Sequence, residues 1–232
     1  MKSRRISAVL FSVLFVLSAS AYGNNNTIIG DNAGEFCDTC NYDTFMGAYS
    51  GRWCTSGQWN TYVGYNVGIQ VNGNYNTFIG AEAGYGNSSA NYNTFVGSEA
   101  GRDITSGEDN VFLGYQAGLG NHEGSQNTFV GVNAGFSSAA GGYDVFLGES
   151  AGYYNHGSWN TFVGALAGQN NYTGNGNVFI GHNAGSSETG SNMLYIDNCN
   201  IMDGSGNCTQ PLIKGTFDNP RTVSIDGALT VT

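Results

Sequence analysis

Five cysteines are the residues of this chain best suited to covalent chemistry: Cys37, Cys40, Cys54, Cys199 and Cys208. Cys37 and Cys54 each lie three residues after an Ala-Gly or Ser-Gly pair, and they are 17 residues apart. In a fold that stacks this 17-residue spacing into coils, the two would lie about 4.8 Å apart. That separation is within the range of a disulfide. The spacing predicts a Cys37–Cys54 disulfide, with Cys37–Cys40 as its nearest competitor.

The two cysteines near the C-terminus, Cys199 and Cys208, bracket a loop and are predicted to close it. Cys40 is then left free or joined to another chain. A metal site made of Cys37, Cys40 and Cys54 is disfavoured, because no histidine lies nearby in sequence to complete four ligands. No catalytic triad pattern, phosphate-binding loop or HExxH motif is found in the chain. The sequence therefore predicts no catalytic residue, no metal site and no cofactor.

A series of aromatic residues stands immediately before a recurring Asn or Asp. Its members are Tyr42, Trp59, Tyr75, Tyr92, Tyr143 and Trp159. A column of exposed rings is suited to binding sugars or the surface of a partner. The alternative is that the rings pack over a corner of the fold and stack on one another from coil to coil.

A series of threonines forms a second column with regular spacing. Its members are Thr27, Thr44, Thr61, Thr77, Thr94, Thr128 and Thr161. Evenly spaced hydroxyls and methyls on a flat face are what an ice-binding β-solenoid needs. Valines interrupt the column at positions 111, 145 and 178, and its neighbours on the same face are bulky aliphatic residues. The alternative is that these are β-branched strand formers in a packed interface.

The element that must position these residues is a repeat. The motif seen at Asn93–Gly101 recurs along the chain. Its first glycine falls at positions 30, 47, 64, 80, 97, 114, 131, 148, 164 and 181. The spacing is 17 residues with two steps of 16, which is too short for a helical hairpin repeat. We therefore predict an all-β fold: a parallel β-solenoid, or β-roll, of about ten 17-residue coils over residues 22–190, roughly 48 Å long.

Each repeat places an aromatic residue or Ile beside an aliphatic residue or Met, as in Phe95 and Val96. Neighbouring residues of a strand point to opposite faces, so one of these columns faces the inside of the coil and the other does not. The outer column must be covered by a second chain or stand open, which favours a homo-oligomer. The repeated Asn shares the aromatic face and is predicted to form a hydrogen-bonded ladder.

The first 21 residues have the pattern of a secretory signal peptide. Basic residues at positions 2, 4 and 5 precede an apolar run from Ile6 to Leu17, which is too short to span a bilayer, and Ala19-Ser20-Ala21 forms a cleavage site. Removing this segment leaves 4 basic and 17 acidic residues, a net charge of −13. Nucleic acid and anionic membranes are unfavourable partners for so acidic a chain, because both need a positive face. The signal peptide leads us to expect a mature protein that is secreted or displayed at the cell surface, with no stable membrane insertion after cleavage.

After residue 190 the repeat gives way to three shorter apolar segments, near residues 192–197, 211–213 and 223–225. These are predicted to be strands of a small β cap, or of the start of a fibre shaft, over residues 191–232. A cap closes the end of a solenoid, whose last coil would otherwise offer unpaired backbone groups.

The repeated Asn-Thr-Phe-Val-Gly-x-x-Ala-Gly phrase resembles the repeats of exported bacterial surface proteins and of phage or phage-like tail fibres. More distantly it is similar to the left-handed β-roll heads of trimeric autotransporter adhesins. The resemblance covers residues 26–185 and continues through the segments near 194–198, 211–213 and 223–227. It implies a trimeric structural fibre that attaches to a glycan or protein of a host or other surface. The alternative function is ice binding through the threonine column.

Overall fold

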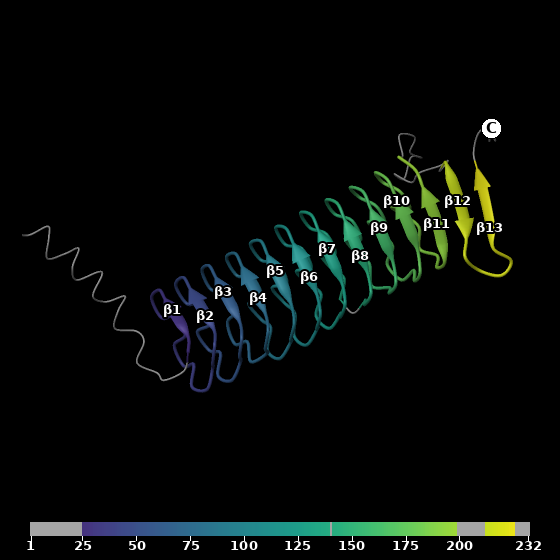
Figure 1. The fold of residues 1–232 in the computed structure, drawn as a ribbon. Helices are drawn as coiled ribbons and strands as arrows, with labels where there is room; N and C mark the ends of the chain where they lie inside the picture. The colour runs from purple at the N-terminus through teal and green to yellow at the C-terminus, as the bar shows by residue number, and fades with distance from the viewer. Residues whose placement is uncertain (1–24, 140, 199–211, 226–232) are drawn as a thin grey trace, which may run out of the picture.

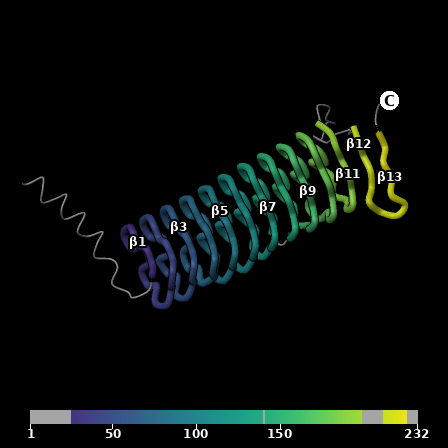
Figure 2. The backbone as a smooth tube through the Cα atoms, in the orientation of Figure 1, coloured from purple at the N-terminus to yellow at the C-terminus, as the bar shows by residue number. Residues whose placement is uncertain are grey.

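The protein is a rod of stacked coils, seen as a ribbon in Figure 1 and as a backbone tube in Figure 2. This computed structural model describes residues 25–139, 141–198 and 212–225. The predicted signal peptide and the predicted Cys199–Cys208 pair lie outside the described residues. In the described part of the chain all regular structure is β, and each coil contributes one strand to a single 13-stranded sheet. The predicted β-solenoid is confirmed.

Each of the first ten strands is three residues long, and the last three are four residues long. They are β1 (Thr27–Ile29), β2 (Thr44–Met46), β3 (Thr61–Val63), β4 (Thr77–Ile79), β5 (Thr94–Val96), β6 (Val111–Leu113), β7 (Thr128–Val130), β8 (Val145–Leu147), β9 (Thr161–Val163), β10 (Val178–Ile180), β11 (Met193–Ile196), β12 (Ile213–Thr216) and β13 (Thr222–Ile225).

The order of strands in the sheet follows the chain, from β1 to β13. From β1 to β11 neighbours are parallel and pair equivalent residues, as Phe95 does with Phe112. Two antiparallel pairs, β11 with β12 and β12 with β13, then extend the same sheet. The C-terminal segment thus continues the solenoid sheet as a hairpin, with β12 beginning at Ile213, where the predicted 211–213 segment ends.

Glycine fixes the corners of each coil. Gly97 ends β5 with φ of 140°, and Gly101 turns the corner with φ of 58°. A Cβ on Gly101 would lie 2.5 Å from Cε2 of Phe95, so no larger residue fits against the ring. Gly107, near the return turn, is required for a different reason. A Cβ there would lie 2.2 Å from the carbonyl oxygen of Gly124 in the next coil, so close approach requires the glycine.

The aromatic column forms the core. The rings of Phe45, Tyr62, Phe78, Phe95, Phe112, Phe129, Phe146, Phe162 and Phe179 are fully buried. From Phe45 to Tyr195 consecutive ring centroids lie 4.6 to 5.2 Å apart, so the rings form one continuous stack. Because aromatic residues face inward, the aliphatic column faces outward.

A column of buried Asn side chains ties each coil to itself and to the next coil. Asn93 is representative. Its Nδ2 donates to the carbonyl oxygen of Gly107 in its own return turn, at 2.9 Å. Its Oδ1 accepts the backbone N–H of Asn110 in the next coil, also at 2.9 Å. The predicted ladder is confirmed, and the contact repeated in every coil is side chain to backbone.

Candidate functional surfaces and the cysteine cluster

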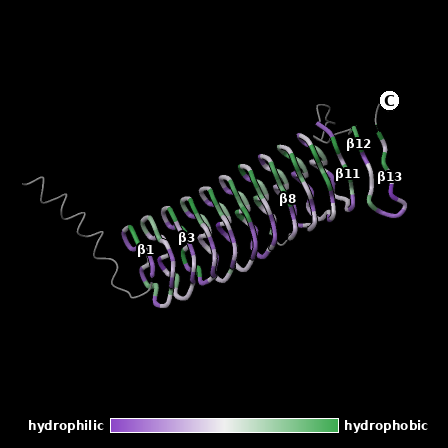
Figure 3. Tube along the Cα trace, in the orientation of Figure 1, coloured by the Kyte–Doolittle hydropathy of each residue, from purple (hydrophilic) through white to green (hydrophobic). Residues whose placement is uncertain are grey.

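The outward face of the strands carries the predicted threonine column. All seven of its threonines begin a strand, and Val111, Val145 and Val178 take that place in β6, β8 and β10. These side chains are partly or largely exposed. Beside them runs the aliphatic column, where Ile29, Met46, Ile79, Leu113, Leu147 and Ile180 are 36–41% exposed. Hydrophobic colouring recurs along the strands in Figure 3. The result is a regular face of hydroxyl, methyl and larger apolar groups.

The six predicted surface aromatics form two ladders at one corner of the rod. Tyr42, Trp59, Tyr75 and Tyr92 form the first, with neighbouring rings within 6° of parallel and centroids 4.2, 6.5 and 5.1 Å apart. Tyr143 and Trp159 form the second, at 6.1 Å and 22°. Asp109 and Gln126 hold the same position in the two coils between them. The predicted stacking from coil to coil is present, and the rings are also 46–64% exposed.

Stacking limits what these ladders can bind. Inside a ladder each ring face is covered by its neighbour, so ring edges and tyrosine hydroxyls face outward. Only an end ring offers an uncovered face. The end rings are Tyr42, Tyr92, Tyr143 and Trp159. The last three, at 57%, 57% and 64%, are the most exposed members of the column, whereas Tyr42 is 46% exposed. The most exposed flat surfaces suited to a sugar ring are therefore at Tyr92, Tyr143 and Trp159.

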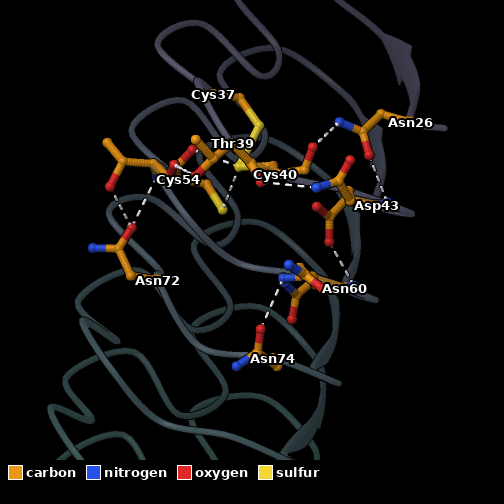
Figure 4. Close-up of a disulfide and its surroundings, with 12 residues drawn as sticks. Asn26, Cys37, Thr39, Cys40, Asp43, Cys54, Asn60, Asn72 and Asn74 are labelled. Atoms are coloured by element: carbon orange, nitrogen blue, oxygen red, sulfur yellow. Dashed lines mark hydrogen bonds between the residues drawn. A yellow bond between two sulfur atoms is a disulfide. The ribbon is translucent and has the colours of Figure 1, made fainter. Parts of the chain in front are cut away.

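The structure corrects the predicted disulfide. Cys37 is bonded to Cys40, with their Cα atoms 5.7 Å apart, and Cys54 is a buried free cysteine. Cys37 and Cys54 do occupy equivalent positions in neighbouring coils. Cys40, however, takes the place that glycine has in most return turns, and its side chain reaches the interior between the other two (Figure 4). The spacing of the cysteines in the sequence assigns each one to a coil, but it does not show that the Cys40 side chain points into the interior.

Cys54 lies in the same buried cluster. Its Sγ is 3.3 Å from Sγ of Cys40, and its carbonyl oxygen is 2.7 Å from that same sulfur. Burial raises the pKa of the Cys54 thiol to about 12. Backbone hydrogen bonds from Gly57 and Ser56 lower this pKa by less, and the charge of Asp43 raises it further. The thiol is therefore protonated at neutral pH.

Two buried aspartates were not among the predicted sites. Asp43 and Asp144 replace the repeated Asn in their coils, and Oδ1 of each accepts the next coil's backbone N–H as an Asn would. Within the described part of the chain neither Oδ2 atom has a hydrogen-bond partner. A Cβ on Gly141 would lie 2.8 Å from Oδ2 of Asp144, much as one on Gly107 would lie 3.1 Å from Nδ2 of Asn110. Oδ2 thus occupies the place of the missing amide donor.

This arrangement favours the protonated carboxyl, which alone can donate to the turn carbonyl as an amide does. Burial, partly offset by hydrogen bonds from Asn60, raises the pKa of Asp43 from 3.8 to about 6. Burial likewise raises the pKa of Asp144 to about 7, against hydrogen bonds from Asn160. The sequence did contain a signal for these two sites, because Asp replaces the repeated Asn only at positions 43 and 144.

Among the described residues, no group of three or more His, Cys, Asp or Glu side chains is placed to hold a metal ion. The same part of the chain contains no helix with the length and apolar character needed to cross a bilayer. Comparison with known proteins finds no matching family model, no matching curated protein and no matching solved structure.

Proposed function

We propose that this protein is a secreted or surface-displayed structural rod that mediates attachment, without catalytic activity of its own. The observation that carries the proposal is the in-register repetition of exposed side chains over ten coils. Weak contacts made by each coil add through multivalency when the target surface is also repetitive. The stacked aromatic core and the asparagine column keep the spacing of those contacts fixed.

The partner surface that fits the ladder ends is a glycan, because an uncovered aromatic face suits the apolar face of a sugar ring. We expect the triple variant Tyr92→Ala, Tyr143→Ala, Trp159→Ala to lose binding to a glycan-coated surface by roughly tenfold or more, equivalent to about 1.4 kcal/mol. Retention of the mature chain on a panel of immobilised polysaccharides measures this.

Tyr75→Ala is the matched control, since Tyr75 lies inside a ladder with both ring faces covered. It should weaken binding much less than the triple variant. Equal retention of wild type and triple variant would remove the ladder ends from the attachment mechanism, and a protein surface would then be the target to test.

The outward aliphatic column supports assembly into a homo-oligomer, with a trimer proposed. Soluble monomers seldom leave a continuous apolar stripe uncovered, and here one residue in each coil contributes to it. Sedimentation equilibrium of the mature chain tests this directly. A mass three times that of the chain is expected, and a monomer at all concentrations would eliminate the trimer.

Ice binding is the second candidate function, favoured by the outward threonine column on a parallel, in-register sheet. Under this hypothesis Thr94→Tyr, in the middle of the face, abolishes thermal hysteresis because a bulky ring breaks the flat contact. Thr105→Tyr, at an exposed loop residue of the same coil, is the control. A wild-type chain with no thermal hysteresis would rule out this function and leave attachment unaffected.

A further inference from the structure

Three sulfur atoms from two neighbouring coils meet at the N-terminal end of the rod (Figure 4). Cys37 and Cys40 belong to the first coil and are joined by a disulfide. Cys54 belongs to the second coil, and its Sγ lies 3.3 Å from Sγ of Cys40. Cys40 and Cys54 are fully buried, whereas Cys37 is only partly buried. Cys40 is therefore in contact with two possible partners, one of which is closer to solvent.

We propose that these three cysteines form an internal thiol–disulfide exchange site, which transfers the free thiol from buried Cys54 to partly exposed Cys37. The Cys54 thiolate attacks Sγ of Cys40, forming a Cys40–Cys54 disulfide. The Cys37–Cys40 bond breaks, its electron pair leaves with Cys37, and the proton lost by Cys54 is restored on Cys37. One disulfide and one thiol are present before and after, so no external oxidant or reductant is required.

The exchange changes what the disulfide joins. Cys37–Cys40 closes a loop inside one coil, whereas Cys40–Cys54 fastens the first coil to the second. The terminal coil has a neighbour on one side only among the described coils, so a covalent link to the second coil opposes its fraying. The released Cys37 thiol becomes a modification site at the edge of the rod. Thiol-reactive compounds, or the disulfide of another molecule, are its chemical class of partner.

The rate of exchange follows the thiolate population of Cys54. Burial raises the pKa of this thiol to about 12, and the groups whose charges are coupled to it are the carboxyl of Asp43 and the phenol of Tyr62. At pH well below 12 the thiolate fraction rises tenfold for each pH unit, so the initial exchange rate should rise roughly tenfold per unit between pH 7 and 9. The exchange is slow at neutral pH and faster in alkali.

The sequence allows a direct test, because proteases separate all three cysteines. Cleavage after Arg52 divides Cys54 from the other two, and cleavage before Asp38 divides Cys37 from Cys40. The oxidised mature chain is incubated at pH 7, 8 and 9 with N-ethylmaleimide, quenched in acid, and mapped without reduction by mass spectrometry. We expect N-ethylmaleimide on the Cys37 peptide, together with a Cys40–Cys54 cross-link that accumulates at the predicted rates.

Two variants complete the test. Cys54→Ser should keep Cys37 linked to Cys40 and leave both unlabelled, because the attacking thiol is gone. Cys37→Ser should form the Cys40–Cys54 disulfide on oxidation and gain thermal stability over its reduced form. The proposal is overturned if native wild type never carries label on Cys37, or if Cys40 and Cys54 of Cys37→Ser both stay reduced under conditions that oxidise the wild-type pair.

Discussion

Asp144→Asn is expected to raise the free energy of unfolding at pH 8 by on the order of 4 kcal/mol. The asparagine restores the donor that its coil lacks, because Nδ2 in place of Oδ2 can bond the turn carbonyl of Gly157, as Asn93 bonds Gly107. The same change removes a carboxylate from a fully buried site, where an unpaired charge is costly. Asp43→Asn should act in the same direction by a smaller amount.

The pH dependence of the wild type follows from the same group. The pKa of Asp144 is raised from 3.8 to about 7 in the folded chain, so the folded state binds the proton more tightly than the unfolded state. Its contribution to stability is fully present below pH 4 and is lost as pH rises through 7. Wild type is therefore expected to be more stable at pH 4 than at pH 8 as far as this residue contributes, and Asp144→Asn should flatten the curve.

Urea unfolding followed by circular dichroism at pH 4, 6 and 8 measures both effects, with midpoints compared between variants. Asp109→Asn, an exposed aspartate at a corner, is the control and should leave the profile unchanged. The reverse substitution, Asn110→Asp, should introduce a new loss of stability above neutral pH. An Asp144→Asn midpoint at or below that of wild type at pH 8 would contradict the assigned role of Oδ2.

Phe112→Ala is expected to lower the free energy of unfolding by about 3–5 kcal/mol, the usual cost of emptying a buried aromatic site. Phe112 is fully buried, and its ring lies 4.9 Å from that of Phe95 and 4.7 Å from that of Phe129. Because coils contact only their neighbours, the loss should be concentrated in the coils on either side. Hydrogen exchange should show that the substitution accelerates amide exchange at β5 to β7 more than at the ends of the rod.

Leu113→Ala is the matched control for this substitution. Leu113 is the next residue on β6 but faces outward and is 36% exposed, so truncating it should cost well under half as much. If the two substitutions cost the same, the assignment of inner and outer columns is refuted.

Much of the fold was predictable because every coil repeats the same pattern of strand-forming residues and glycines. Thr94, Phe95 and Val96 favour a strand, Gly97 ends it, and equivalent residues of neighbouring copies align. Which column faces inward was left open by the sequence, since aromatic and aliphatic side chains are both suited to a core. The three-dimensional structure settles it: Phe95 is fully buried, and Asn93, on the same face, donates to the carbonyl of Gly107 inside the coil.

The sites were less predictable because they depend on departures from the repeat. Cys40 was expected to be left over, yet its position in the return turn brings it to Cys37 within the same coil. The aromatic ladders were predicted as a column, but their division into covered and uncovered ring faces depends on Asp109 and Gln126 interrupting the stack. Asp144 has a carboxyl group where the equivalent residues of most coils have an amide. It matters because the Nδ2 of those asparagines donates a hydrogen bond that a carboxylate cannot make.

The asparagine column also bears on how such a rod can lengthen. The Oδ1 of each Asn accepts a hydrogen bond from the backbone N–H of the coil that follows, and its own backbone N–H donates to Oδ1 of the coil before. Asp43 and Asp144 accept the same bond through their Oδ1 atoms, so the junctions between coils share one backbone contact. Tandem duplication or loss of one 17-residue segment by unequal recombination would join two ends that already fit. Duplication or deletion of repeats in the gene can therefore change the length of the rod in steps of about 4.8 Å without requiring a new interface between coils.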